Sequence, residues 1–195
     1  MKNNKTDPRA RYTQSVIRKS LLKLLAQKPL KNVTVAEVCR EAQVTRGTFY
    51  NHYYDVFDVY ASIENDFFEE IKTRISGRKT YELDDSFFRE IMSFLSENSD
   101  VMTMLLADGE ESAILKKIIR FMRDKYVAEF SDRFPALDRS LLEALYTYTV
   151  NGSIGLVLEW LRQGKRESTE QMAVLIEVFN KILIAGYFKA LAADL

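Results

Sequence analysis

Apolar residues recur every three or four positions along most of the 195-residue chain, the spacing that gathers them on one face of an α-helix. The longest such stripe runs from residue 55 to residue 76. Asp55 can cap the start of this helix, and Gly77 is a suitable stop. The stripe therefore predicts one long helix, whose inward positions are Tyr60, Ile63, Phe67, Ile71 and Ile75.

The same spacing predicts helices on both sides of this segment. Pro29 disfavours helix at Lys28 and ends the first helix, and the polar stretch 78–85 (RKTYELDD) indicates a linker before the later ones. The predicted fold class is all-α, with about nine helices. Besides 55–76, the expected helical segments are 9–27, two short helices within 34–53, 86–96, 99–107, 112–130, 138–163 and 168–193.

The stretch from Thr34 to Tyr53 (TVAEVCREAQVTRGTFYNHY) predicts two short helices joined by a tight turn. Thr34 can cap the first helix, and Glu37 three residues later completes a capping box. Thr45 is a second capping residue, and Phe49 and Tyr53, four apart, share a buried side. The remaining surface carries hydrogen-bond donors and little acidic charge, which suits insertion into a DNA major groove. The stretch therefore predicts a helix-turn-helix.

This motif also resembles a known family. The sequence RGTFYNHY, preceded by TVAEVCREAQV and followed by a long helix opening at Asp55, is similar to the DNA-binding domain of the tetracycline-repressor (TetR) family of bacterial regulators. The resemblance covers about residues 9–71, and beyond it only the helix pattern is similar. Gln43 stands where the family usually has a turn glycine, so we expect a left-handed conformation there at some steric cost. Val56 stands where a lysine commonly contacts phosphate, which predicts one backbone contact fewer and lower non-specific affinity.

The resemblance implies a division of the chain into parts with different roles. Residues 1–54 would form the helix-turn-helix DNA-binding domain, linked by the helix 55–77 to a helical domain for effector binding and dimerisation over 78–195. In this family the linking helix is the lever through which the effector domain sets the spacing of the two DNA-reading heads.

The resemblance also implies which residues contact DNA. Four match positions at base edges and nearby phosphates, and among these Arg46 suits bidentate recognition of guanine. Three others match phosphate contacts; for His52 an ordinary surface histidine is the alternative. The base-edge candidates are Thr45, Arg46, Thr48 and Asn51, the phosphate candidates are Thr34, Tyr50 and His52, and Gly47 lies on the same surface.

The charge of the chain is unevenly distributed. The formal net charge is +0, which at first argues against a nucleic-acid partner. Residues 1–54, however, hold 11 Lys/Arg against three acids, a net charge of +8, and residues 55–195 hold 17 against 25, a net charge of −8. A basic head on an acidic body indicates a polyanion partner at one end only. Within the first helix, Arg18, Lys19 and Lys23 are expected to stay solvated.

The later helices carry methionine and aromatic residues that suit a flexible apolar ligand. A small organic effector is expected because the resemblance implies one. At helical spacing such residues are more often ordinary core, and this region could equally bind a protein partner. The candidate pocket residues are Phe88, Met92, Met102, Met104, Phe121, Met122, Tyr126 and Tyr148.

The last two helices hold more apolar residues than one subunit's core needs, and glycines interrupt the first of them. A mid-helix glycine costs about 1 kcal/mol relative to alanine, and close approach of another helix is a reason to keep it. TetR-like proteins pair these helices across a two-fold axis, which predicts a homodimer; an intramolecular core is the alternative. The candidate interface residues are Leu145, Gly152, Gly155, Leu158, Leu175, Phe179, Ile182 and Gly186.

Other functional classes find little support. The one histidine and the one cysteine both fall in the predicted DNA head, so neither an enzyme, a metal site nor a cofactor is expected. Cys39 lies on an apolar helix face and is expected to be a small packed residue rather than a redox sensor. No apolar run approaches the roughly 20 residues that span a bilayer, and the N-terminus lacks the apolar core of a signal peptide, so we expect a cytoplasmic protein without a membrane partner.

The sequence therefore predicts a homodimeric, ligand-responsive regulator that binds a palindromic operator in double-stranded DNA, more often a repressor than an activator. The alternative is a co-regulator of the same fold that has lost specific DNA recognition and works through its effector domain. Gln43, Val56 and the acidic body keep that alternative open.

Overall fold

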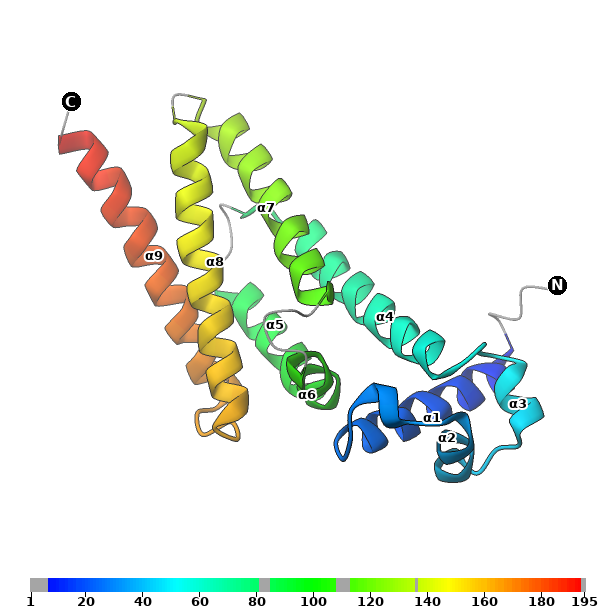
Figure 1. Cartoon of the computed structure of the whole chain (residues 1–195). Coiled ribbons are helices and arrows are strands. Elements are labelled where there is room, and N and C mark those ends of the chain that lie inside the picture. The colour runs from blue at the N-terminus through cyan, green and yellow to red at the C-terminus, as the bar shows by residue number, and fades with distance from the viewer. Residues whose placement is uncertain (1–6, 81–84, 108–112, 136, 194–195) are drawn as a thin grey trace.

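The structure, a computed structural model, describes residues 7–80, 85–107, 113–135 and 137–193. Within these ranges it contains helices and turns and no strand, which confirms the all-α fold class. Figure 1 shows a small group of N-terminal helices and a larger group formed by α5 to α9, with the long helix α4 running from one to the other.

The N-terminal group contains α1 (Pro8–Leu25), α2 (Val35–Ala42) and α3 (Arg46–Tyr50), with a single 3₁₀ turn, η1 (Leu30–Asn32), between the first two. Asp7 caps α1 through the Arg9 amide. The first helix therefore begins one residue earlier and ends two residues earlier than the pattern predicted, and the 3₁₀ turn was not predicted.

The second motif helix, α3, is shorter than the sequence indicated. It ends at Tyr50, and the next residues form a tight turn in which the amides of His52 and Tyr53 bond to the Phe49 carbonyl oxygen at 2.9 and 3.0 Å. Because Tyr53 keeps this one-turn relation to Phe49, both rings still reach the buried side, as expected.

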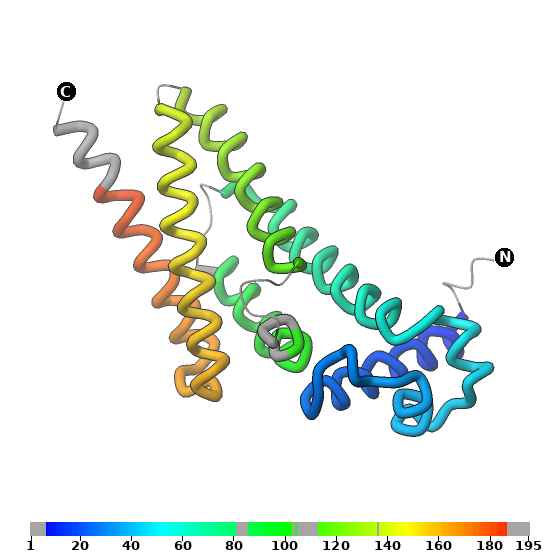
Figure 2. The backbone as a smooth tube through the Cα atoms, in the orientation of Figure 1, coloured from blue at the N-terminus to red at the C-terminus, as the bar shows by residue number. Residues whose placement is uncertain are grey.

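The linking helix α4 (Val56–Ser76) begins after Asp55, whose carboxylate accepts the Asp58 amide at 2.8 Å. Its buried stripe starts at Val56 and Val59 rather than at Tyr60, which is only half-buried. Val56 therefore packs into the core at the position where the family often has a phosphate-binding lysine. Figure 2 traces this helix from the N-terminal group into the larger one.

The larger group consists of five helices whose bounds fall within three residues of the predicted ones. The helix α5 packs along α9, and α7 packs against both α8 and α4 (Figure 1). Part of the predicted linker, residues 81–84, lies outside the described residues. The helices are α5 (Asp85–Glu97), α6 (Ser99–Ala107), α7 (Ala113–Arg133), α8 (Arg139–Arg162) and α9 (Thr169–Ala193).

A continuous apolar core joins the two groups. It runs from Phe49 in the N-terminal group through Phe67 of α4 to Met92 and Ile176. A second cluster lies between α7 and α8, centred on Tyr126 and other residues of the two helices. Because packed interiors transmit displacement, a change in the larger group can reach the small one through α4.

Candidate DNA-binding surface and effector cavity

The start of α2 is held by a capping box, as predicted. The Glu37 amide donates to Thr34 Oγ1 at 3.3 Å, and the Thr34 amide donates to Glu37 Oε2 at 3.0 Å. Lys28 Nζ lies 2.7 Å from Glu37 Oε1, and this contact together with the Thr34 hydrogen bonds lowers the pKa of the Glu37 carboxyl to about 2. A phosphate at Thr34 would have to compete with this carboxylate for the Thr34 amide.

The turn between α2 and α3 depends on Gln43. Its backbone is left-handed (φ 54°, ψ 39°), and its amide bonds to the Arg40 carbonyl oxygen, while the Val44 amide bonds to that of Cys39. This confirms the conformation expected where the family usually has glycine. Cys39 is buried, as expected, and burial raises the pKa of its thiol.

The helix α3 is fixed from inside by Phe49, which is fully buried, with its ring edge-on to Tyr50 at 5.5 Å between ring centroids. Thr45 caps the helix by accepting the Thr48 amide at 3.1 Å, and the two threonine hydroxyls lie 2.9 Å apart. The buried Phe49 and the Thr45 cap consequently fix which side chains of α3 face away from the core.

The predicted DNA-binding residues lie at the start of α2, at the start and along the length of α3, and in the turn that follows α3. Most are exposed, and Thr48 and His52 are half-buried. The exposed ones are Thr34, Thr45, Arg46, Gly47, Tyr50 and Asn51.

Two exposed aromatic side chains near the C-terminal end of α3 were missed by the sequence analysis. Tyr54 is 85% exposed and Phe57 is 55% exposed. Phe57 lies off the buried stripe of α4, and this offset from the apolar spacing could have indicated from the sequence that the side chain is exposed. Asp55 and Asp58 lie beside them, so these rings offer apolar contact without added attraction for phosphate.

Arg18 of α1 was expected to stay solvated, but its side chain contacts residues of other helices. Its Nε donates to the Tyr53 hydroxyl at 3.0 Å, and its guanidinium pairs with Asp66 of α4. One side chain therefore joins α1 to the end of the DNA-binding motif and to the linking helix.

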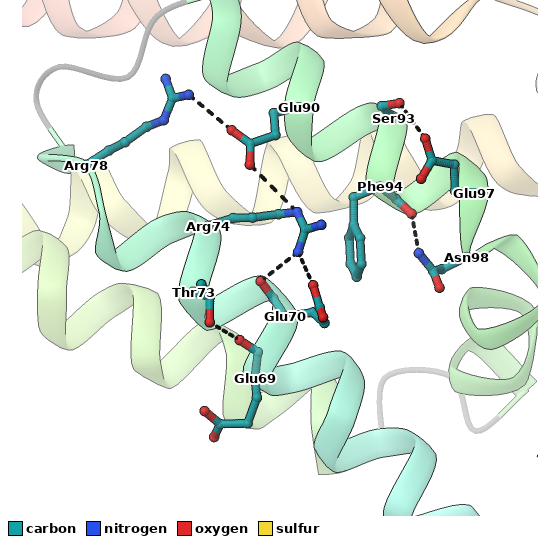
Figure 3. Close-up of polar contacts among 10 residues, drawn as sticks. All are labelled: Glu69, Glu70, Thr73, Arg74, Arg78, Glu90, Ser93, Phe94, Glu97 and Asn98. Carbon is teal, nitrogen blue, oxygen red and sulfur yellow. Dashed lines mark hydrogen bonds and ion pairs between the residues drawn. The ribbon is translucent and has the colours of Figure 1, made fainter. Parts of the chain in front are cut away.

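A second polar network joins α4 to α5 (Figure 3). Arg74 Nη1 lies 2.5 Å from Glu70 Oε2 on its own helix, and Arg74 Nε lies 3.7 Å from Glu90 Oε1 on α5. Arg78 Nη2 donates to the other Glu90 oxygen at 3.0 Å. The Arg74 guanidinium also lies over the Phe94 ring, 4.2 Å from its centroid. The C-terminal part of α4 is thus fastened to α5 by charge as well as by packing.

A largely apolar cavity of about 620 Å³ lies beside this junction, within the usual size range for small-molecule sites. Its wall is formed by residues of α4 to α9. The linking helix itself contributes Phe67, Ile71 and Ile75. A ligand in the cavity would therefore touch the element that leads to the DNA-binding motif.

Five of the eight pocket candidates line this cavity, and three do not. Met104 is buried in the core, and Phe121 packs edge-on against Phe68 of α4 at 6.0 Å between centroids. Tyr148 of α8 is 67% exposed and lies outside the lining of the cavity. The candidates that line the cavity are Phe88, Met92, Met102, Met122 and Tyr126.

The cavity has a few polar groups in its wall. Glu177 of α9 is 7% exposed, and its Oε1 lies 2.5 Å from Lys181 Nζ. Asn180 Nδ2 donates to Ser153 Oγ at 3.3 Å. Burial raises the pKa of the Tyr126 phenol to about 12, so this hydroxyl remains protonated at neutral pH. Glu177 was not among the pocket candidates, because these were chosen from methionine and aromatic residues.

The candidate dimer residues divide in a different way. Leu175, Phe179 and Ile182 are 37%, 47% and 62% exposed, an apolar strip along α9 that the described chain does not cover. A Cβ added at Gly152 or at two other candidate glycines would meet no heavy atom within 4 Å, so no other described helix approaches them closely. Leu158 differs, because it lines the cavity and packs against the core. The other two glycines are Gly155 and Gly186, and Leu145 is half-buried.

The described part of the chain holds no group of three His, Cys, Asp or Glu side chains that could hold a metal ion. None of its helices is both long and apolar enough to cross a membrane.

The fold and the helix-turn-helix define a DNA-binding regulator, and comparison with known proteins identifies its family. Residues 17–55 match the family of bacterial regulatory proteins of tetR type, and residues 85–181 match a transcriptional regulator C-terminal region of the same group. Together the two segments cover more than half of the chain. The chain belongs to the TetR family of transcriptional regulators, which are DNA-binding proteins and not enzymes.

Individual relatives are distant. An uncharacterised helix-turn-helix transcriptional regulator of Bacillus subtilis, YxbF, is 22% identical over 169 residues, which are 82% of this chain and 42% of that protein. The chain therefore spans about two fifths of the length of this relative.

Two solved structures are similar in fold. A putative TetR-family regulator from Syntrophomonas wolfei shares 20% identity at a TM-score of 0.68, covering 89% of this chain and 95% of that one. A putative fatty acid metabolism regulator from Clostridium perfringens shares 16% identity at a TM-score of 0.65, covering 88% and 97%.

Proposed function

We propose that this TetR-family regulator binds a palindromic operator as a homodimer, as a repressor in the cytoplasm, and releases it when a small organic ligand enters the cavity. The observation that carries the proposal is the path of α4. This helix begins beside α3 with the buried Val56 and later lines the cavity with Phe67, Ile71 and Ile75. One element therefore leads from the DNA-binding motif to the cavity.

The uncovered apolar strip on α9 supports the proposed dimer, since burying Leu175, Phe179 and Ile182 against a second copy would remove them from water. Two copies related by a two-fold axis would present two α3 helices to successive major grooves, about 34–36 Å apart or a multiple of that. A ligand that shifts α4 changes this spacing and lowers operator affinity. By linkage, DNA lowers ligand affinity by the same factor.

Selection from a random duplex library by the purified protein at near-physiological salt tests this function. We expect enrichment of a near-palindrome. Arg46→Ala should relax the preference at one base pair per half-site, because Arg46 is the exposed side chain suited to bidentate guanine recognition. Equal weakening on all sequences would show that Arg46 contacts only phosphate.

The same selection separates the proposal from a co-regulator without specific DNA recognition. One observation favours that alternative, the burial of Val56 where a phosphate-binding lysine is common in the family. A protein of that kind would enrich no sequence, and its duplex binding would vanish as salt rises.

A further inference from the structure

A buried carboxylate lies in the wall of the largely apolar cavity. Glu177 is the one Asp or Glu that is buried among the residues whose side chains the structure describes. Its ion-pair partner there is Lys181, one turn later on α9, with Nζ 2.5 Å from Glu177 Oε1. Both residues line the cavity, and they are the only lysine, arginine, aspartate or glutamate in its described lining.

The Glu177 and Lys181 side chains differ in how much of each is exposed to solvent. The Lys181 side chain is 67% exposed, whereas that of Glu177 is 10% exposed. Lys181 and Ala185, both exposed, mark the part of the wall where the cavity reaches the surface. A rotation of the flexible lysine stem carries its ammonium fully into water, but Glu177 has no such path. When Lys181 swings out, the cavity keeps a buried negative charge.

This asymmetry selects the charge of a ligand. An anion would lie near the Glu177 carboxylate, and like charges repel strongly in a medium of low dielectric constant. A cation can take the place of Lys181 and leave the cavity neutral. The aromatic rings of Phe67, Phe88 and Tyr126 are in the same wall, and the faces of such rings attract cations.

A second polar group, the hydroxyl of Tyr126, belongs to the part of the cavity wall that α7 contributes. The Tyr126 hydroxyl is buried and has no hydrogen-bond partner among the described residues, although Tyr126 lines the cavity. Buried polar groups in folded proteins are nearly always paired. A ligand with an oxygen or nitrogen acceptor toward α7 would satisfy this donor.

We infer that the cavity recognises an amphipathic organic cation, whose ammonium group pairs with Glu177 in place of Lys181 and whose apolar body fills the space beside α4, α5 and α7. The inference rests on the proposed ligand-responsive function and specifies the chemical class of its ligand.

Calorimetric titration of the full-length protein with three probes of equal chain length tests the ligand class. The probes are decyltrimethylammonium and decanoate, each below its micelle-forming concentration, and decan-1-ol below its solubility limit. We expect decyltrimethylammonium to bind at least about 10-fold more tightly than the other two. Decanoate binding as tightly as the cation, or no binding by any probe to the folded protein, would overturn the inference.

Two cavity variants and one control assign the effect to the carboxylate. Glu177→Gln keeps the shape and removes the charge, so it should weaken decyltrimethylammonium at least about 10-fold and leave decan-1-ol unchanged. Lys181→Gln removes the competitor and should strengthen the cation. Glu159→Gln removes a charge from an exposed position of α8, 55% exposed, and should change nothing. Unchanged cation binding in Glu177→Gln would contradict the proposed pairing.

Duplex binding measured in parallel separates this inference from the proposed function. Cation binding that depends on Glu177 but leaves operator affinity unchanged would confirm the ligand class and contradict ligand-responsive regulation. Release of the operator by decanoate instead would keep the regulatory function and overturn the ligand class.

Discussion

At the scale of single residues, the left-handed Gln43 stands out. A left-handed conformation raises the energy of a residue with a Cβ by about 1–2 kcal/mol, while glycine adopts it freely. Nothing in its described contacts requires the Gln43 side chain, since the turn is held by backbone hydrogen bonds to Arg40 and Cys39. The strain is therefore a local property that one substitution can remove.

We predict that Gln43→Gly stabilises the protein by about 0.5–1 kcal/mol, the relief of strain less the greater entropy that glycine has in the unfolded chain. Urea unfolding followed by circular dichroism measures the change as a higher midpoint at constant slope. Ala36→Gly, at an exposed helical position of α2, is the matched control and should destabilise by about 1 kcal/mol. A lower midpoint in Gln43→Gly would show that the side chain has a stabilising role.

Other residue-scale features could be predicted because they depend on neighbours in the chain. The capping box at Thr34 and Glu37, and the shared burial of Phe49 and Tyr53, involve residues three or four apart. Arg18 could not be predicted in this way, since its partners Tyr53 and Asp66 are 35 and 48 residues away.

At the scale of elements, the relation between α4 and α5 matters most, because α4 joins the cavity to the DNA-binding motif. Arg74 makes two contacts to α5, one with Glu90 and one with the Phe94 ring, and its side chain is 26% exposed (Figure 3). Phe94 in turn lies 5.2 Å from Phe67 between ring centroids, and Phe67 lines the cavity. The contacts of Arg74 with α5 therefore lie directly behind the wall of the cavity.

We predict that Arg74→Gln lowers stability by about 1 kcal/mol, from the lost cation–π contact and a partly screened ion pair. Differential scanning calorimetry should show a fall in Tm of roughly 2–4 °C for a chain of this size. Arg162→Gln, which removes an exposed pair within α8, is the control and should leave Tm unchanged. Equal Tm values in the two variants would mean that Arg74 does not fasten α4 to α5.

The elements themselves were largely predictable. Helix bounds agree within three residues because apolar periodicity, caps and Pro29 act locally. The exception is α3, where the pattern of Phe49 and Tyr53 indicated one helix through both. A tight turn gives the same one-turn offset between these residues, so periodicity alone does not distinguish the two.

At the scale of the whole molecule, an apolar strip on α9 remains exposed to solvent. Phe179 and Ile182 are exposed large side chains, and neither lines the cavity. Contiguous exposed apolar residues of this kind mark interaction surfaces. The strip therefore provides a test of the proposed homodimer that leaves the cavity intact.

We predict that Phe179→Asp weakens self-association at least about 30-fold, because a charge would be buried in an apolar interface. Sedimentation equilibrium measures the dissociation constant. Ala128→Asp introduces the same charge at an exposed position of α7 and should leave association unchanged. A monomeric wild-type protein, or equal association in both variants, would place any dimer contact elsewhere.

The sequence by itself determined the all-α class, the order and approximate bounds of the helices, and the helix-turn-helix with its exposed donors. These follow from interactions between residues a few positions apart, which leave a periodic signature in the chain. The same signature placed Met92 and Tyr126 on apolar helix faces but placed Tyr148 there as well.

Only the tertiary structure decided which of these faces meet and where they leave space. It turned Tyr148 outward, brought Glu177 into the wall of the cavity and placed Phe67 of α4 against the same space. Periodicity shows that a face is apolar, not which partner covers it. Whether the packing of several distant helices leaves a cavity depends on side-chain volumes and helix orientations together, and these are set by the assembled core.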